Sequence, residues 1–122
     1  MVEDPTIVYV QTHGTDEMPK AATPFYLATA AAAMDMEVSI YFTMHGPLLL
    51  RKDSRDLTVK DGGAPLSTFI DQAQGIGVRL LVCQPSLDLN DLEMDDLING
   101  VEMIGGAAFN DMAVEADAVI SF

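Results

Sequence analysis

The stretch Val78–Cys83, which reads VRLLVC, decides the fold class of this chain of 122 residues. It is nearly continuous in apolar character, as are strands of a parallel sheet that is buried on both faces. Outward from it, the β-branched and aromatic residues that favour strands recur in four further runs. We therefore predict five strands, at Thr6–Gln11, Glu37–Phe42, Val78–Cys83, Val101–Ile104 and Ala118–Phe122.

The segments between these strands predict helices, at Ala21–Met34, Pro65–Gln74, Asp91–Ile98 and Ala107–Glu115. In the first of them, Pro24 suits an opening helical turn and Thr23 is a suitable N-cap. Alternation of strands and helices with short connections predicts a parallel sheet that is covered on both faces. The length fits one domain, and we assign residues 1–122 to it.

The charge balance argues against two classes of partner. Nineteen acidic and six basic residues give a formal charge of -13. Such a surface repels phosphate backbones and anionic lipids, so we predict no nucleic acid and no membrane partner. An acidic proteome would explain the same charge without any partner.

The sequence also shows none of the features expected of an exported protein. No apolar run approaches the ~20 residues of a transmembrane helix, and Met1–Asp4 lacks the basic and apolar regions of a signal peptide. A single cysteine cannot form an internal disulfide. We expect a cytoplasmic protein.

Three chemically capable side chains follow the first three strands, namely His13, His45 and Cys83. The carboxyl ends of parallel strands share one edge of a sheet, where ligands bind, so we expect all three along that edge. A thiol there can be a nucleophile if a nearby His or a helix N-terminus favours the thiolate. A buried cysteine that packs as a small hydrophobe fits the same pattern, and the residues leave both readings open.

Further residues complete the candidate site. His13 and His45 either favour the thiolate or satisfy loop hydrogen bonds. Arg51 and Lys52 either hold an anionic substrate or belong to a solvated loop. Gly46 and Ser86, in the loops after the second and third strands, complete the predicted substrate-binding set.

We predict neither a metal nor a cofactor. A metal site of His13, His45 and Cys83 is conceivable, but no HxH, HxxxH or CxxC spacing supports it. Gly105-Gly106 lacks the GxGxxG context of a dinucleotide site and indicates a turn instead.

Three blocks of the sequence resemble the DsrE/DsrF-like family. Val38–Leu50 (VSIYFTMHGPLLL) is similar to the family's F-T-x-x-G-x-x-L-L motif, and Leu80–Ser86 (LLVCQPS) to its cysteine-bearing third strand. Gly100–Phe122 (GVEMIGGAAFNDMAVEADAVISF) resembles its C-terminal block. The resemblance implies a three-layer α/β/α fold around a five-stranded, mainly parallel sheet, for which we expect a flavodoxin-like strand order.

The resemblance also implies a function. Cys83 would hold a persulfide and pass its sulfur to an acceptor protein, as in a sulfur carrier or sulfurtransferase; whether this makes the chain an enzyme stays open. Expected partners are sulfur-donor and acceptor proteins. The chain itself is expected to form a homotrimer or homohexamer. Two alternatives remain: a non-catalytic assembly or regulatory subunit with a structural Cys83, and a small-molecule-binding enzyme that uses the same sheet edge.

Overall fold

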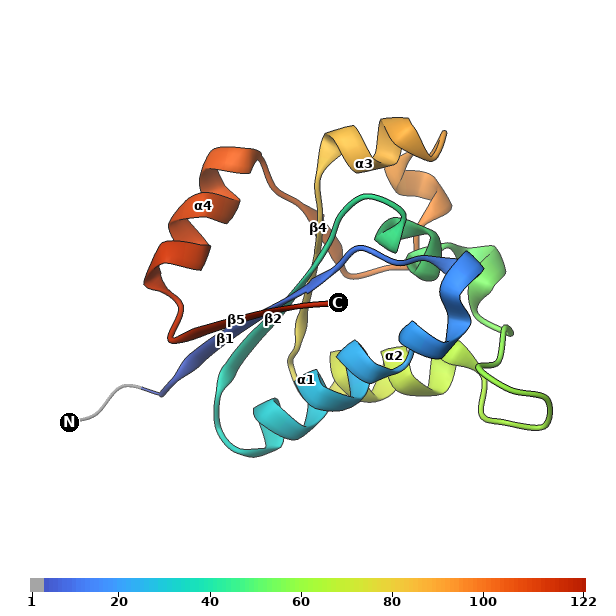
Figure 1. Ribbon diagram of the computed structural model, residues 1–122, viewed down its shortest axis with the longest axis horizontal. Coiled ribbons are helices and arrows are strands. Elements are labelled where there is room, and N and C mark those ends of the chain that lie inside the picture. The colour runs from blue at the N-terminus through green and yellow to red at the C-terminus, as the bar shows by residue number, and fades with distance from the viewer. Residues whose placement is uncertain (1–3) are drawn as a thin grey trace.

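The computed structural model describes residues 4–122, in which five strands form one sheet (Figure 1). Every strand pairing is parallel, as predicted. The strands run within one or two residues of the predicted bounds: β1 Thr6–Gln11, β2 Glu37–Phe42, β3 Arg79–Val82, β4 Val101–Met103 and β5 Ala118–Ser121.

The strand order is β4-β3-β2-β1-β5, so the expected flavodoxin-like order 2-1-3-4-5 was wrong. Strands β1 to β4 follow one another in a single direction across the sheet, and only β5 lies on the other side of β1. Contacts between distant parts of the chain decide this order. Asp117, just before β5, accepts a hydrogen bond from the Thr6 amide at 2.8 Å, and its own amide donates to the Thr6 carbonyl.

The order of the strands explains why the two faces of the sheet are covered unequally. Helices α1 (Thr23–Ala33) and α2 (Leu66–Gly75) cover one face, and the short α3 (Gln84–Leu89) follows β3 at its carboxyl end (Figure 1). When successive strands are added in one direction across a parallel sheet, right-handed crossovers place the connecting helices on the same face of the sheet. The return from β4 to β5 therefore puts α4 (Gly106–Glu115) on the opposite face, where it is the one helix of the described chain. The fold has three layers, as expected, but one is a single helix.

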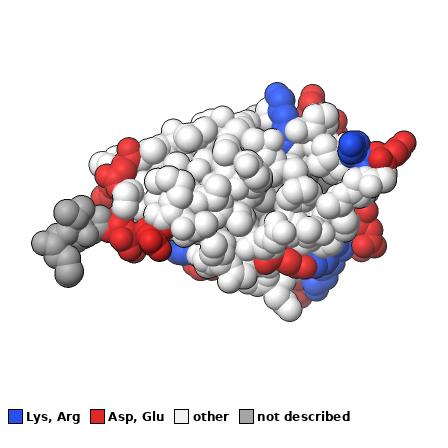
Figure 2. Space-filling model, turned by 90° about the horizontal axis from the view of Figure 1, so that it is seen from below, with Lys and Arg blue, Asp and Glu red and all other residues white. Residues whose placement is uncertain are grey.

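The hydrophobic core follows the same asymmetry. The larger cluster lies under α1 and α2 and includes Phe25, Phe42, Ile70 and Leu80, all at most 1% exposed. Figure 2 views the molecule from this side, where charged residues gather toward the rim and the middle carries almost none. On the opposite face a small cluster lies under α4 and consists of Tyr41, Leu81 and Cys83 with partly buried neighbours.

Two local predictions were wrong. Thr23 is the first residue of α1, and Ala22, which has no side-chain hydrogen bond to the helix, occupies the N-cap. No helix spans Asp91–Ile98: α3 begins directly after Cys83, with Pro85 in its first turn, and only Met94–Asp96 form a 3₁₀ turn. Asp91 adopts a left-handed φ of 54°, which ends the helical path before the acidic run. Across residues 4–122, no helix is long and apolar enough to cross a membrane.

Candidate functional site at Cys83

Cys83 lies where β3 ends and α3 begins. Its backbone is extended, with φ -108° and ψ 150°, and it is the N-cap residue of α3. The side chain packs with Tyr41 and Leu81 on the α4 face of the sheet, where Ile104 and Phe109 lie against the same cluster. Only 8% of the residue is exposed to solvent. The thiol is therefore at the predicted edge, but it lies beneath the segment that leads into α4.

Three hydroxyl groups surround the thiol. Thr43 Oγ1 lies 3.6 Å from Cys83 Sγ, and Ser86 Oγ donates to the Cys83 carbonyl at 2.8 Å. Burial by itself raises the pKa of the Cys83 thiol, but hydrogen bonds from Ser86, Tyr41 and Thr43 outweigh it, so that the pKa is lowered from its ordinary 9.0. The site therefore favours a thiolate within a mostly apolar pocket.

Tyr41 is the aromatic member of this set. The residue is 7% exposed, and its ring stacks on that of Phe109 in α4, with the ring centroids 4.1 Å apart. Burial, followed by hydrogen bonding to Cys83, raises the pKa of the Tyr41 hydroxyl, which therefore remains a proton donor. The sequence analysis missed Tyr41 and Thr43. Side chains two residues apart along a strand point to the same face of the sheet, and Thr43 follows Tyr41 by two residues at the end of β2. This alternation would have placed both side chains on the face that carries Cys83.

The loops that carry the two histidines lie side by side at this edge. The Thr43 amide donates to the Gln11 carbonyl at 3.1 Å, and the His45 amide donates to the Thr12 carbonyl at 3.2 Å. Gly46 is buried in this contact, and a Cβ added to it would run into the Gln11 carbonyl oxygen. Close packing of two loops thus requires Gly46, whose substrate-binding role stays a prediction.

Neither histidine ring is hydrogen-bonded to the thiol within residues 4–122. His13 Nδ1 lies 3.2 Å from Thr12 Oγ1, and its Nε2 lies 3.5 Å from Lys20 Nζ. His45 Nδ1 lies 3.0 Å from Asn90 Oδ1. The same part of the chain contains no group of three or more His, Cys, Asp or Glu residues placed to hold a metal ion.

Asn90 connects the second and third loops, and the sequence analysis overlooked it. Its Nδ2 donates to the Ser86 carbonyl at 2.6 Å and to the Met44 carbonyl at 2.7 Å. Asn90 follows the last residue of α3, and Met44 has a left-handed φ of 53°. One amide therefore ties a helix end to a strained loop beside the thiol.

The two predicted anion-binding residues are engaged elsewhere. Arg51 Nη2 pairs with Asp53 Oδ2 at 3.3 Å, and Lys52 Nζ donates to the Asp95 carbonyl at 2.7 Å. Neither side chain is hydrogen-bonded to Cys83 in the described chain. Their role toward a substrate stays a prediction.

Comparison with known proteins agrees with this geometry. The model of the DsrE/DsrF-like family matches residues 6–122. The "Sulfur carrier protein DsrE2" of Allochromatium vinosum is 26% identical over 156 aligned positions, which cover 95% of this chain and 97% of that protein.

Two solved structures share the fold. The YchN protein of E. coli superposes with a TM-score of 0.76 at 14% identity, over 98% of this chain and 100% of its own. Protein MTH1491 of Methanobacterium thermoautotrophicum, whose function is unknown, superposes with a TM-score of 0.70 at 19% identity, again over 98% and 100%. At these identities the likeness concerns the fold alone.

Proposed function

This chain belongs to the DsrE/DsrF-like family, and from that premise we propose that it is a cytoplasmic sulfur carrier that holds a persulfide on Cys83. Family membership and a relative named as a sulfur carrier support a role in sulfur relay. The observation that carries the finer proposal is the surroundings of the thiol, where hydrogen bonds from Ser86, Tyr41 and Thr43 lower the pKa of Cys83. A thiolate is the form that attacks sulfur.

The transfer balances without an added oxidant or reductant. The Cys83 thiolate attacks the outer sulfur of a donor persulfide, R–S–SH. The donor's S–S bond breaks, its inner sulfur leaves as the thiolate RS⁻, and Cys83 becomes S–SH. An acceptor thiolate then attacks this outer sulfur, and Cys83 leaves as a thiolate again. Thr43 and Tyr41 stabilise the anion at the start and at the end of the cycle.

One cysteine makes the carrier depend on other molecules. With no second thiol in the chain, both donor and acceptor lie outside it, and proteins of sulfur relay are the proposed partners. We propose a homotrimer or homohexamer of this one domain. The exposed apolar residues of the α4 side, Val114 at 86% and Val119 at 45%, support an assembly that would cover them.

A second candidate rests on the burial of the thiol. Cys83 is only 8% exposed and packs against Leu81 and Tyr41. A non-catalytic subunit, in which the cysteine is a core residue, would have this packing too. Access to the thiol therefore separates the two candidates.

The deciding experiment is intact-mass spectrometry of the native chain after incubation with glutathione persulfide. The carrier should gain about 32 Da, the mass of one sulfur, and lose it to an added acceptor thiol. Cys83→Ser should gain nothing. If the native chain stays unmodified while the urea-unfolded chain reacts, the thiol is a core residue and the second candidate replaces the first.

A further inference from the structure

Asn90, which follows the last residue of α3, engages both polar atoms of its side-chain amide. Its Nδ2 donates to the Ser86 carbonyl at 2.6 Å and to the Met44 carbonyl at 2.7 Å. Its Oδ1 lies 3.0 Å from His45 Nδ1. Because an amide oxygen only accepts hydrogen bonds, the His45 ring carries its proton on Nδ1 in this contact. The amide is therefore held in one orientation from three sides.

The two carbonyls that Asn90 binds lie next to hydroxyl groups of the thiol site. Met44 directly follows Thr43, whose Oγ1 lies 3.6 Å from Cys83 Sγ. Ser86 itself carries the second hydroxyl, which donates to the Cys83 carbonyl at 2.8 Å. Hydrogen bonds from both residues lower the pKa of the Cys83 thiol. One side chain therefore joins two segments that each supply a hydroxyl group to the site.

The loop after β2 needs an external contact to keep its shape. The Gly46 amide donates to the Thr43 carbonyl at 2.8 Å, so that Met44 and His45 are the central residues of a tight turn. Met44 has a left-handed φ of 53°, which residues other than glycine seldom adopt and which persists where the surroundings hold it. The hydrogen bond from Asn90 to the Met44 carbonyl is such a contact. Without it, relaxation of Met44 would shift the neighbouring Thr43 hydroxyl relative to the thiol.

Asn90 influences the thiol through these two segments, since its amide has no hydrogen bond to Cys83 in the described chain. We propose that Asn90 is a positioning residue for sulfur transfer at Cys83. By binding two backbone carbonyls at once, it keeps the hydroxyls of Thr43 and Ser86 beside the reacting residue. His45 then acts on the thiol through the amide of Asn90, and not by direct contact. This inference deepens the proposed function and rests on it.

The test follows two reactions of the full-length chain, alkylation by iodoacetamide against pH and sulfur uptake from glutathione persulfide. In Asn90→Ala the alkylation midpoint should move to higher pH. The rate at neutral pH, relative to its plateau at high pH, should fall about three- to tenfold, because weaker hydrogen bonds leave less thiolate. Sulfur uptake at neutral pH should slow as well. The midpoint is decisive, because altered access to the thiol scales the rate at every pH alike.

A second variant separates the two carbonyls and preserves the end of α3. In Asn90→Ser the hydroxyl can still donate to the carbonyl four residues earlier, that of Ser86, but it is too short to reach Met44. The alkylation midpoint should therefore still rise. Asn90→Ser and Thr43→Val together should shift the midpoint no further than Thr43→Val alone, because both changes remove the same hydroxyl contact.

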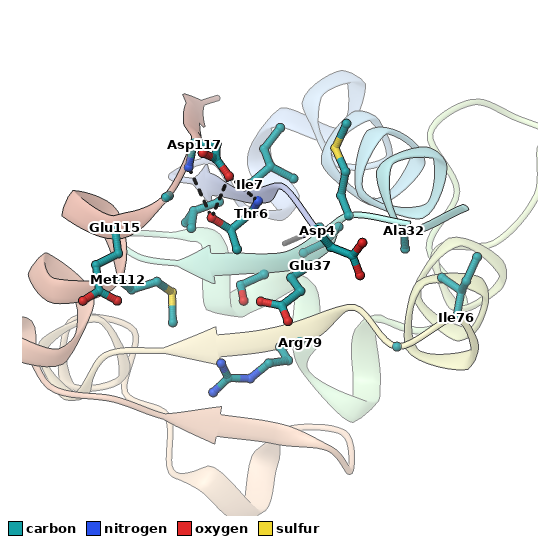
Figure 3. Close-up of a pocket in the computed structure, with 16 residues that line it drawn as sticks. Asp4, Thr6, Ile7, Ala32, Glu37, Ile76, Arg79, Met112, Glu115 and Asp117 are labelled. Carbon is teal, nitrogen blue, oxygen red and sulfur yellow. Dashed lines mark hydrogen bonds between the residues drawn. The ribbon is translucent and has the colours of Figure 1, made fainter. Parts of the chain in front are cut away.

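Asp117→Ala is the matched control at the other end of the strands. Asp117 likewise joins two distant segments, since its Oδ2 accepts from the amide and the hydroxyl of Thr6 at 2.8 and 3.4 Å (Figure 3). Its loss should lower stability and leave both reactions of Cys83 unchanged. If the unaltered chain takes up sulfur, an unmoved midpoint in the Asn90 variants, or an equal movement in Asp117→Ala, overturns this proposal alone. If the unaltered chain takes up none, the proposed function fails together with it.

Discussion

The rings of Tyr41 in β2 and Phe109 in α4 stack with centroids 4.1 Å apart and planes 17° from parallel. This contact fastens α4, the only helix on its face of the sheet within residues 4–122, to the cluster that contains Cys83. Packing of α4 and access to the thiol are therefore linked through one aromatic pair.

Phe109→Ala should loosen α4 and expose the thiol. We expect the free energy of unfolding to fall by about 2–3 kcal/mol, less than for a fully buried Phe because Phe109 is only partly buried. Alkylation of Cys83 in the native protein should become faster. Val114→Ala, which alters an 86% exposed residue of the same helix, is the control and should change neither quantity. An unchanged alkylation rate in Phe109→Ala would mean that α4 does not limit access.

The hydroxyl groups around Cys83 should set its reactivity. Ser86→Ala, Thr43→Val and Tyr41→Phe each remove a hydrogen bond that favours the thiolate, so each should raise the pKa of Cys83. The measurement is the rate of iodoacetamide alkylation against pH. In the unaltered chain the midpoint should lie below 9.0. A midpoint at or above that value, or variants with the same midpoint, would contradict this account of the site.

The same hydrogen bonds should make stability depend on pH. The pKa of Cys83 is lower in the folded chain than the ordinary 9.0 of an unfolded one, so the ionised thiol favours folding. This contribution is complete above 9.0 and is lost as pH falls through the lowered pKa. Urea unfolding below pH 10, where Tyr41 stays neutral, should show the gain in the unaltered chain. Cys83→Ala should lack it; identical pH profiles for the two proteins would refute the linkage.

Asn90 should matter more for stability than His45 does. Asn90→Ala removes two donated hydrogen bonds, to the Ser86 and Met44 carbonyls, and should cost about 1–3 kcal/mol. Asn90→Asp should cost more, because a carboxylate would face those carbonyl oxygens. His45→Ala, at an exposed position, should cost less than about 1 kcal/mol. Chemical denaturation of the three variants gives the ranking, and an equal effect of Asn90→Ala and His45→Ala would contradict it.

Gly46 and Gly75 offer a matched pair of substitutions. Gly46→Ala forces a Cβ into the Gln11 carbonyl oxygen and should destabilise the protein by about 2 kcal/mol or more, through the separation of two loops at the Cys83 edge. Gly75→Ala, at the last residue of α2, meets no atom within 4 Å and should be neutral or slightly stabilising. Thermal unfolding distinguishes them, and a neutral Gly46→Ala would show that the loops can move apart.

Sequence reasoning worked best where the information is local. The apolar, β-branched runs predicted all five strands and their parallel pairing. This was possible because a strand that is buried on both faces of a sheet is nearly continuously apolar, which its own residues reveal. It failed at Asp91–Ile98, where we predicted a helix and the structure has a 3₁₀ turn at Met94–Asp96. The helix lies at Gln84–Leu89 instead, next to Cys83 and with Pro85 in its first turn.

By itself, then, the sequence determined the fold class, the family resemblance and the position of Cys83 at the carboxyl end of a buried strand. Tertiary structure decided the strand order, and with it the position of α4 and the stack of Tyr41 on Phe109. The physical reason is that strand composition reports burial, which is local. The neighbour of each strand depends on hydrogen bonds such as Thr6 to Asp117, which join residues that are distant in the chain.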